Sequence, residues 1–140
     1  MAIYKARQGD AALVSLDQGD DLLEGLTKVA KELEMHAGTI EVIGALRKLR
    51  FGIYDLDRKE YDILEPQGHF ELLNGTGNVA LKDGEPFVHL HVTASGSDGT
   101  ALGGHAMPGC EVFVAEAIFR IHAGNMPVRE LDPSRGLALW

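Results

Sequence analysis

The sequence predicts an α+β fold, built on a mainly antiparallel, curled β-sheet that one main helix covers. Two observations lead to this class. A single stretch, about residues 20–35, has apolar side chains at helical spacing. Most of the remaining chain consists of short apolar or alternating runs that end at turn residues, which is typical of strands. One helix combined with many strands indicates an α+β domain.

The length of 140 residues and the hydrophobic share of 45% fit a single domain, residues 1–140, with its own core. No apolar run approaches the roughly 18 residues of a membrane span. The N-terminus lacks the basic and then apolar layout of a signal peptide. The single cysteine, Cys110, excludes an internal disulfide and suits a reducing compartment. We therefore expect a cytoplasmic protein with no membrane partner.

The elements follow from local patterns. One or two strands are expected in residues 3–14, interrupted at Gly9. Acidic residues at 17–21 then mark the start of the amphipathic helix, because the helix dipole favours negative charge there, and Ala37-Gly38 is its expected end. The later expected strands are 39–45, 46–55, 61–64, 69–81, 87–93 and 110–121, and the tail from 128 is expected to be a loop before a short strand or ordered end. The run 110–121 is apolar on both faces, so we expect burial on both sides, by the helix and by another subunit or strand.

Residues 87–105 carry the candidate site. Side chains alternate along a strand, so His89 and His91 lie on one face, a common beginning of a divalent-metal site. His105 follows a turn at 96–99. A three-residue loop places it opposite His91 on the same face, whereas a slip of one residue turns it away. The turn has two possible centres, so the residues alone do not decide between these two registers. Separately, Gly103-Gly104 indicates a bulge or a close backbone approach.

Five runs then stand in a specific order along nearly the whole chain. They are 44–47 (GALR), 68–73 (GHFELL) with glycines at 75 and 77, 86–92 (PFVHLHV), 103–112 (GGHAMPGCEV) and 129–132 (RELD). In this order they resemble the "plants and prokaryotes conserved" (PPC) domain. The resemblance implies an α+β fold that assembles as a homotrimer. It also implies a zinc site, because some prokaryotic members resemble metal proteins in which three histidines hold zinc.

The histidines that match this pattern are His89, His91 and His105, which favours the register that places all three on one face. Zinc is the first choice of metal, since three imidazoles with one open position are typical of a reactive zinc site, although nickel, copper and iron also bind imidazole. The open position would hold water or a small anionic ligand. Arg47 and Glu71 are the polar residues expected near such a pocket. The simpler interpretations are histidines that line a sheet face, a surface arginine and an edge carboxylate.

Nucleic-acid binding is the alternative that the resemblance carries, because plant members join this domain to AT-hook segments and act in gene regulation. The net charge of −8 argues against it, since duplex binding depends on cations that neutralise phosphates. Arg135-Gly136 is followed by Leu137, so the Arg-Gly-Arg-Pro core of an AT-hook is absent. His69 stands where the plant run has arginine.

These observations lead to three functional hypotheses. The first is a zinc-bearing domain that binds a small ligand or hydrolyses an unknown substrate. The second is a DNA-binding regulator. The third is an assembly module in which the metal only joins strands. No general base with a defined geometry can be named, so no reaction is assigned. Cys110 is expected to be a small buried side chain, with a role as a fourth ligand as its less favoured interpretation.

Overall fold

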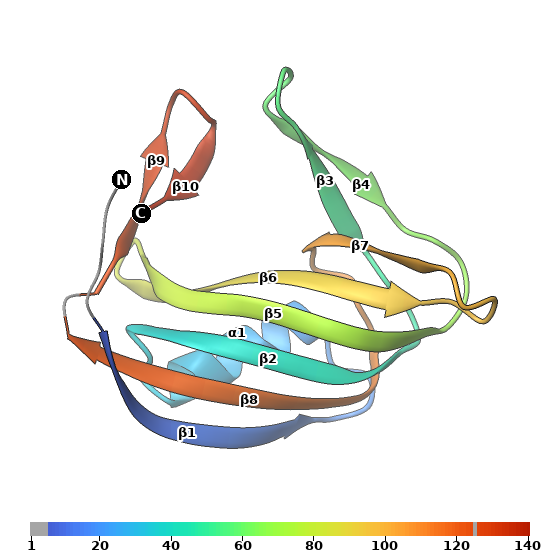
Figure 1. The fold of residues 1–140 in the computed structure, drawn as a ribbon, viewed down its shortest axis with the longest axis horizontal. Coiled ribbons are helices and arrows are strands. Elements are labelled where there is room, and N and C mark those ends of the chain that lie inside the picture. Colours follow the sequence, from blue (N-terminus) through green and yellow to red (C-terminus); the bar gives the residue numbers. More distant parts are fainter. Residues whose placement is uncertain (1–5, 125) are drawn as a thin grey trace.

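The fold is an antiparallel sheet with one helix, and the structure, a computed structural model, describes residues 6–124 and 126–140. Its elements are β1 (Ala6–Leu16), α1 (Leu22–Glu32), β2 (Ala37–Leu46), β3 (Phe51–Asp55), β4 (Glu60–Leu64), β5 (Phe70–Lys82), β6 (Glu85–Ser95), β7 (Ala101–Ala106), β8 (Val112–Gly124), β9 (Val128–Asp132) and β10 (Leu137–Leu139) (Figure 1). The strand order is β1-β8-β2-β5-β6-β7-β3-β4, with every pair antiparallel. The predicted α+β class is therefore confirmed. The sheet is open, with β1 and β4 at the ends of this order, and its expected curl stays a prediction.

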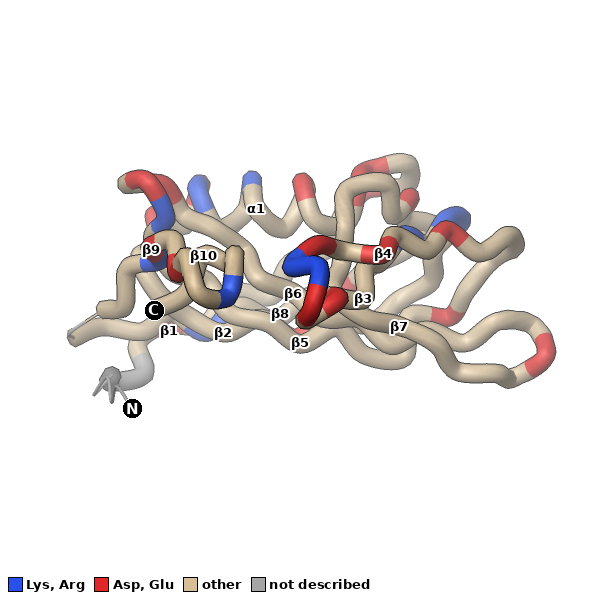
Figure 2. Tube along the Cα trace, turned by 90° about the horizontal axis from the view of Figure 1, so that it is seen from above, with Lys and Arg blue, Asp and Glu red and all other residues tan. Residues whose placement is uncertain are grey.

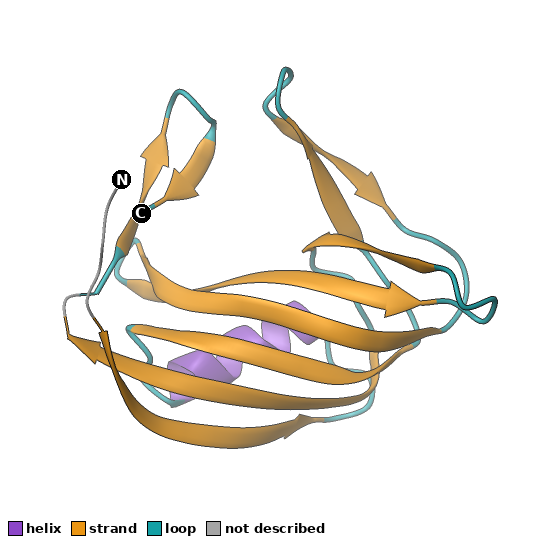
Figure 3. Cartoon of the chain, in the orientation of Figure 1, coloured by secondary structure: helices purple, strands orange, loops and turns teal. Residues whose placement is uncertain are grey.

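Helix α1 lies along one side of the sheet (Figures 2 and 3). Asp21 caps its N-terminus and accepts a hydrogen bond from the Glu24 amide at 2.9 Å, which satisfies one of the free amides of the first turn. Leu22, Leu26 and Ala30 are buried against the sheet. With 11 residues, α1 is too short to cross a membrane. It is the only helix among the described residues.

The helix begins where the acidic run predicts, but it ends earlier than expected. Glu34 adopts a left-handed backbone conformation (φ 50°) just after the helix, and Ala37-Gly38, the predicted stop, instead begins β2. The stretch 46–55 also divides, because residues 47–50 leave the sheet and only Phe51–Asp55 forms a strand. Hydrogen bonds from the Arg47 amide to the Glu111 carbonyl, and from the Arg50 amide to Cys110 Sγ, hold that connection against the start of β8.

The core lies between α1 and one face of the sheet. Its fully buried side chains include Leu26 of the helix, Ile40 of β2, Leu90 of β6 and Phe119 of β8. The expectation for β8 is met on the helix side, and the cover of its other side by another subunit stays a prediction. Its inner residues are buried, but Phe113 on the outer face is 49% exposed, because no element of the described chain covers that side.

Two hairpins extend from the sheet as arms (Figure 1). One arm is β3–β4. The other is β9–β10, where the sequence indicated a loop at 128–132; β9 instead pairs in parallel with the end of β5 and antiparallel with β10. The Tyr54 hydroxyl on the first arm donates a hydrogen bond to the Arg135 carbonyl on the second at 2.6 Å. The arms therefore meet beside the face that carries the histidines.

Candidate metal centre

The hairpin between β6 and β7 sets the position of the third histidine. His91 pairs directly with His105, so both side chains lie on the same face of the sheet. The turn is tight: the Gly96 amide donates to the Thr100 carbonyl at 3.2 Å, and Gly99 takes a left-handed conformation (φ 77°). The sequence allowed two registers for this hairpin, and the structure has the one with a three-residue loop. Asp98 supports it by accepting a hydrogen bond from the Thr100 amide at 2.9 Å.

The glycine pair before His105 marks a close backbone approach and not a bulge, since the β6–β7 register runs without a shift. A Cβ on Gly103 would lie 2.0 Å from the Val92 carbonyl oxygen of β6. A Cβ on Gly104 would lie 2.7 Å from the Gly52 carbonyl oxygen of β3. Only glycine lets β7 lie so close to both neighbours, and this closeness carries His105 to the other two histidines.

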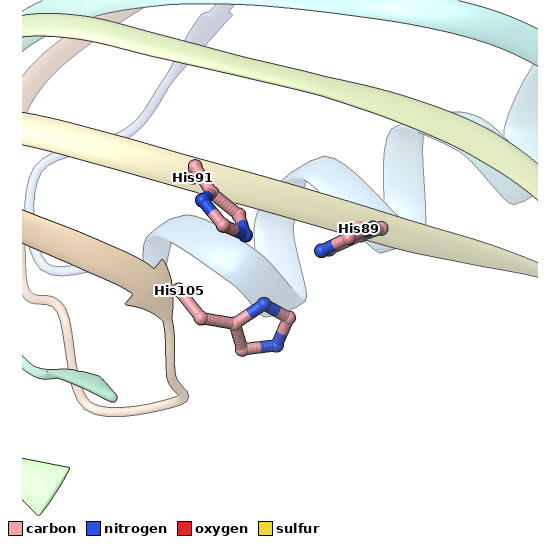
Figure 4. A group of neighbouring side chains, drawn as sticks. All are labelled: His89, His91 and His105. Carbon is pink, nitrogen blue, oxygen red and sulfur yellow. The ribbon is translucent and has the colours of Figure 1, made fainter. Parts of the chain in front are cut away.

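The three imidazole rings converge from two adjacent strands (Figure 4). Ring centroids lie 5.1 Å apart for His89 and His91, 4.9 Å for His89 and His105, and 5.5 Å for His91 and His105. One nitrogen from each ring lies within 4.8 Å of the others. Zinc holds imidazole nitrogens at about 2.0–2.1 Å, so the nitrogens of a tetrahedral site are about 3.4 Å apart. Small rotations of these side chains would bring them to that spacing.

The donor atoms suit a metal in their protonation as well as in their position. Nδ1 of His105 is buried and has no hydrogen-bond partner. Burial, together with the neighbouring charges of Arg129 and His91, lowers the pKa of His89 to about 4. Burial and the other two histidines lower the pKa of His105 to about 4 as well. Both rings are therefore neutral near pH 7 and keep a lone pair for a metal. His91 is exposed, so the group is open on one side.

Comparison with known proteins identifies the family. A family model for the Plants and Prokaryotes Conserved (PCC) domain, also written PPC, matches residues 4–122. The chain belongs to this family. Two solved structures cover all of the chain, each with a TM-score of 0.94. AF0104 from Archaeoglobus fulgidus, described as a metal-containing protein, is 38% identical, and the match covers 99% of its own chain. A plant- and prokaryote-conserved (PPC) protein from Pyrococcus horikoshii is 35% identical, and the match covers 96% of its own chain.

A curated relative is much longer than this PCC chain. The bifunctional protein GlmU of a Synechococcus strain is 28% identical over 120 residues, which are 84% of this chain and 18% of that protein. The chain thus spans less than a fifth of the curated relative that it matches, and the similarity extends to one part of that protein.

Arg47 and Glu71 do not join the histidines of this PCC domain. Both line a separate hollow of about 430 Å³, which the ends of β2 and β5, the β6–β7 turn and β8 surround and which contains none of the three histidines. The Arg47 guanidinium lies 5.0 Å from the centre of the Phe113 ring. Cys110 is also apart from the trio: it is fully buried, and burial raises the pKa of its thiol to about 11.

Two neighbours of the trio were not found by sequence reasoning. Tyr61 of β4 stacks on His105 with ring centroids 4.9 Å apart, and burial raises its pKa. Arg129 of β9 places Nη2 3.3 Å from His89 Nδ1. Arg129 lies in a run that carries the family resemblance, which was the available signal. Tyr61 lies in an ordinary strand pattern that gives no indication of its position.

Proposed function

We propose that this PCC-domain protein binds one zinc ion through His89, His91 and His105 and leaves a position for water or a small anionic ligand. The observation that carries the proposal is the convergence of three imidazole nitrogens, two of them on neutral, half-buried rings and one without any hydrogen-bond partner. The description of the Archaeoglobus relative as a metal-containing protein supports a metal in this fold.

Zinc is preferred because it accepts three nitrogen ligands and commonly keeps a fourth position for water or substrate. When bound, it would lower the pKa of a coordinated water toward about 7. The three histidines would hold the ion, and the exposed side of His91 would give access to it. The group of potential ligands contains no carboxylate, so we propose binding and assign no reaction.

Self-association is the second part of the proposal. We infer a homotrimer of single-domain chains, as the family resemblance implies. Support comes from the uncovered face of the sheet, where Leu13 is 82%, Ile43 55% and Phe113 49% exposed. Apolar side chains that gather on one surface are typical of subunit contacts. Sedimentation velocity on the untagged protein tests this: a trimer is expected, and a monomer at all concentrations would contradict it.

Metal content is the test of the site. Untagged protein, purified without chelator, is analysed by elemental mass spectrometry beside the double variant His89→Ala/His91→Ala. A matched control, His36→Ala/His122→Ala, removes two histidines outside the trio. About one zinc per chain is expected in the parent and the control, and none in the first variant. No metal in the parent, even after zinc is supplied, would refute the proposal.

DNA binding, the alternative that the sequence offered, finds no support in the distribution of charge. Basic and acidic residues are interspersed over the described chain (Figure 2). The densest basic run, 47–50, is neutralised locally: Lys48 pairs with Glu111 at 2.9 Å, and Arg50 lies 3.8 Å from Glu65. A change in the electrophoretic mobility of random duplex DNA on adding the protein at low salt would be evidence for DNA binding.

A further inference from the structure

With 6% of its surface exposed, Arg129 is the one buried charged side chain within residues 9–124 and 126–140. Its guanidinium lies 4.4 Å from the centre of the Trp140 ring and 5.4 Å from that of Phe87. Nη1 donates to the Ala138 carbonyl at 2.9 Å, and Nη2 donates to Asn78 Oδ1 at 2.7 Å. Nε is buried without a hydrogen-bond partner. The side chain is thus held in place with part of its donor capacity unused.

No carboxylate balances this charge in the part of the chain that the structure describes. The ion pairs found there do not include Arg129. Its partners are a carbonyl, an amide oxygen and a histidine, all of them neutral. An arginine stays protonated in proteins, so a full positive charge is buried here without a counter-ion. Such a charge is strongly unfavourable unless an anion is supplied from elsewhere.

The contact between Arg129 and His89 indicates where that anion would bind. A guanidinium only donates hydrogen bonds, so its 3.3 Å contact with His89 Nδ1 uses the lone pair of that ring. A neutral imidazole has one lone pair. Once His89 gives this lone pair to a metal, through either ring nitrogen, none remains for Arg129. Metal loading therefore frees an N–H group of a buried cation beside the metal.

We propose that Arg129 makes the metal centre selective for small anions, namely carboxylates or comparable oxyanions, with one ligand oxygen on the metal and another facing the guanidinium. This inference rests on the proposed metal site. Its basis is charge and position. A divalent ion held by three neutral histidines carries two positive charges, and the adjacent buried arginine adds a third. The group of potential ligands contains no carboxylate to balance them. A planar guanidinium is also the side chain best suited to two oxygens of one ligand.

The surroundings limit the size of the ligand. Tyr61 stacks against His105 on one side, and the ring of Trp140 covers the guanidinium on another. The two arms also meet through the hydrogen bond from Tyr54 to the Arg135 carbonyl. A ligand with few atoms beyond its carboxylate, such as acetate, is therefore the appropriate first probe.

The test uses full-length protein loaded with cobalt(II), whose visible spectrum reports a change of ligand. Acetate is added in increasing amounts to the cobalt-loaded parent protein and to the variants Arg129→Met and Arg129→Lys. The matched control is Arg120→Met, which removes an arginine of β8 that pairs with Glu41. Acetamide, a neutral molecule of similar size, is titrated in parallel. We expect acetate to bind at least ~10-fold more weakly to Arg129→Met, because charge-assisted hydrogen bonds are lost. Arg129→Lys should fall between, and Arg120→Met should match the parent.

Cobalt affinity separates the two proposals. It should be unchanged or higher in Arg129→Met, since a repelling positive charge is removed. If the parent binds no cobalt, the metal site and this inference both fail. If it binds cobalt but takes acetate with the same affinity in the parent and in Arg129→Met, only the inference fails. Should that variant not fold, the unaltered protein still decides: acetamide binding as tightly as acetate would overturn the role of Arg129.

Discussion

Replacing Gly103 by alanine should damage both the stability of the sheet and the metal site. The added Cβ would lie 2.0 Å from the Val92 carbonyl oxygen and 2.9 Å from its carbonyl carbon, both of which are backbone atoms of β6. Backbone cannot rotate away as a flexible side chain can. Because real Cβ contacts are essentially never shorter than 3.0 Å, the two strands must separate by about 1 Å at this point.

The size of the effect follows from that separation. A ladder hydrogen bond of about 2.9 Å that lengthens by about 1 Å is no longer a hydrogen bond. Losing about two of them removes about 2 kcal/mol, and residual overpacking adds about 1–3 kcal/mol. Alanine also restricts the unfolded chain, which returns about 0.5 kcal/mol. The expected net loss is therefore about 2.5–4.5 kcal/mol, a large part of the stability of a small domain.

The same displacement moves His105, which lies two residues further along β7 and pairs with His91. Metal-binding groups must be held within about 0.5 Å of the productive geometry, so zinc affinity should fall at least ~10-fold. Urea unfolding in chelator, followed by circular dichroism, measures the first effect. Competition with a zinc indicator measures the second.

Gly99→Ala is the matched control in the same hairpin. Its Cβ would have no heavy atom within 4 Å, so it adds only the strain of a left-handed alanine, about 1–2 kcal/mol, and leaves the histidines in place. If Gly103→Ala unfolds at the same urea concentration as Gly99→Ala and binds zinc equally well, then the close approach of β6 and β7 does not position His105, and our reasoning about the site is wrong.

Three further predictions concern other parts of the chain. Burial raises the pKa of Cys110 to about 11, so its thiol should resist iodoacetamide at pH 8 until urea is added. The contribution of this residue to stability should be lost as pH rises from about 9 through 11. Alkylation of the native protein at pH 8 would contradict this prediction. Tyr54→Phe removes the hydrogen bond to Arg135, so hydrogen exchange should speed up in β9–β10 and not in the core strands. Asp21→Ala removes the helix cap and a bond to the Gly109 amide, and should lower the free energy of unfolding by about 1–2 kcal/mol, with Asp21→Asn close to the parent.

The sequence could predict those features that depend on neighbours along the chain. The two-residue alternation in β6 placed His89 and His91 on one face with no further information. The position of His105 required the register of a hairpin whose turn allows two centres, and register is decided by pairing across strands. Gly103 takes part in that decision, because its missing side chain permits the close approach, yet a glycine in the sequence does not reveal what it approaches.

The tail and its arginine could not be predicted for a different reason. Residues 128–132 contain charged and apolar side chains with no clear alternation, and a proline follows, so they indicated a loop. The strand forms because the end of β5 offers unpaired backbone groups and β10 folds back on its other side. Strand formation of this kind depends on tertiary partners more than on propensity. The burial of Arg129 follows from the same packing.

The site therefore joins parts of unequal stability. His91 and His105 lie on paired strands, and β6 also carries the fully buried Leu90, so their arrangement is fixed by the core. Tyr61 and Arg129 lie on arms whose strands are mostly exposed and which are joined to each other by a hydrogen bond at their ends. Segments with few buried contacts open without global unfolding. Opening of the arms would remove the arginine and leave the three histidines in place. Changes that loosen the arms, such as Tyr54→Phe, should therefore reduce acetate affinity more than cobalt affinity, and an equal loss of both would show that the arms also hold the histidines.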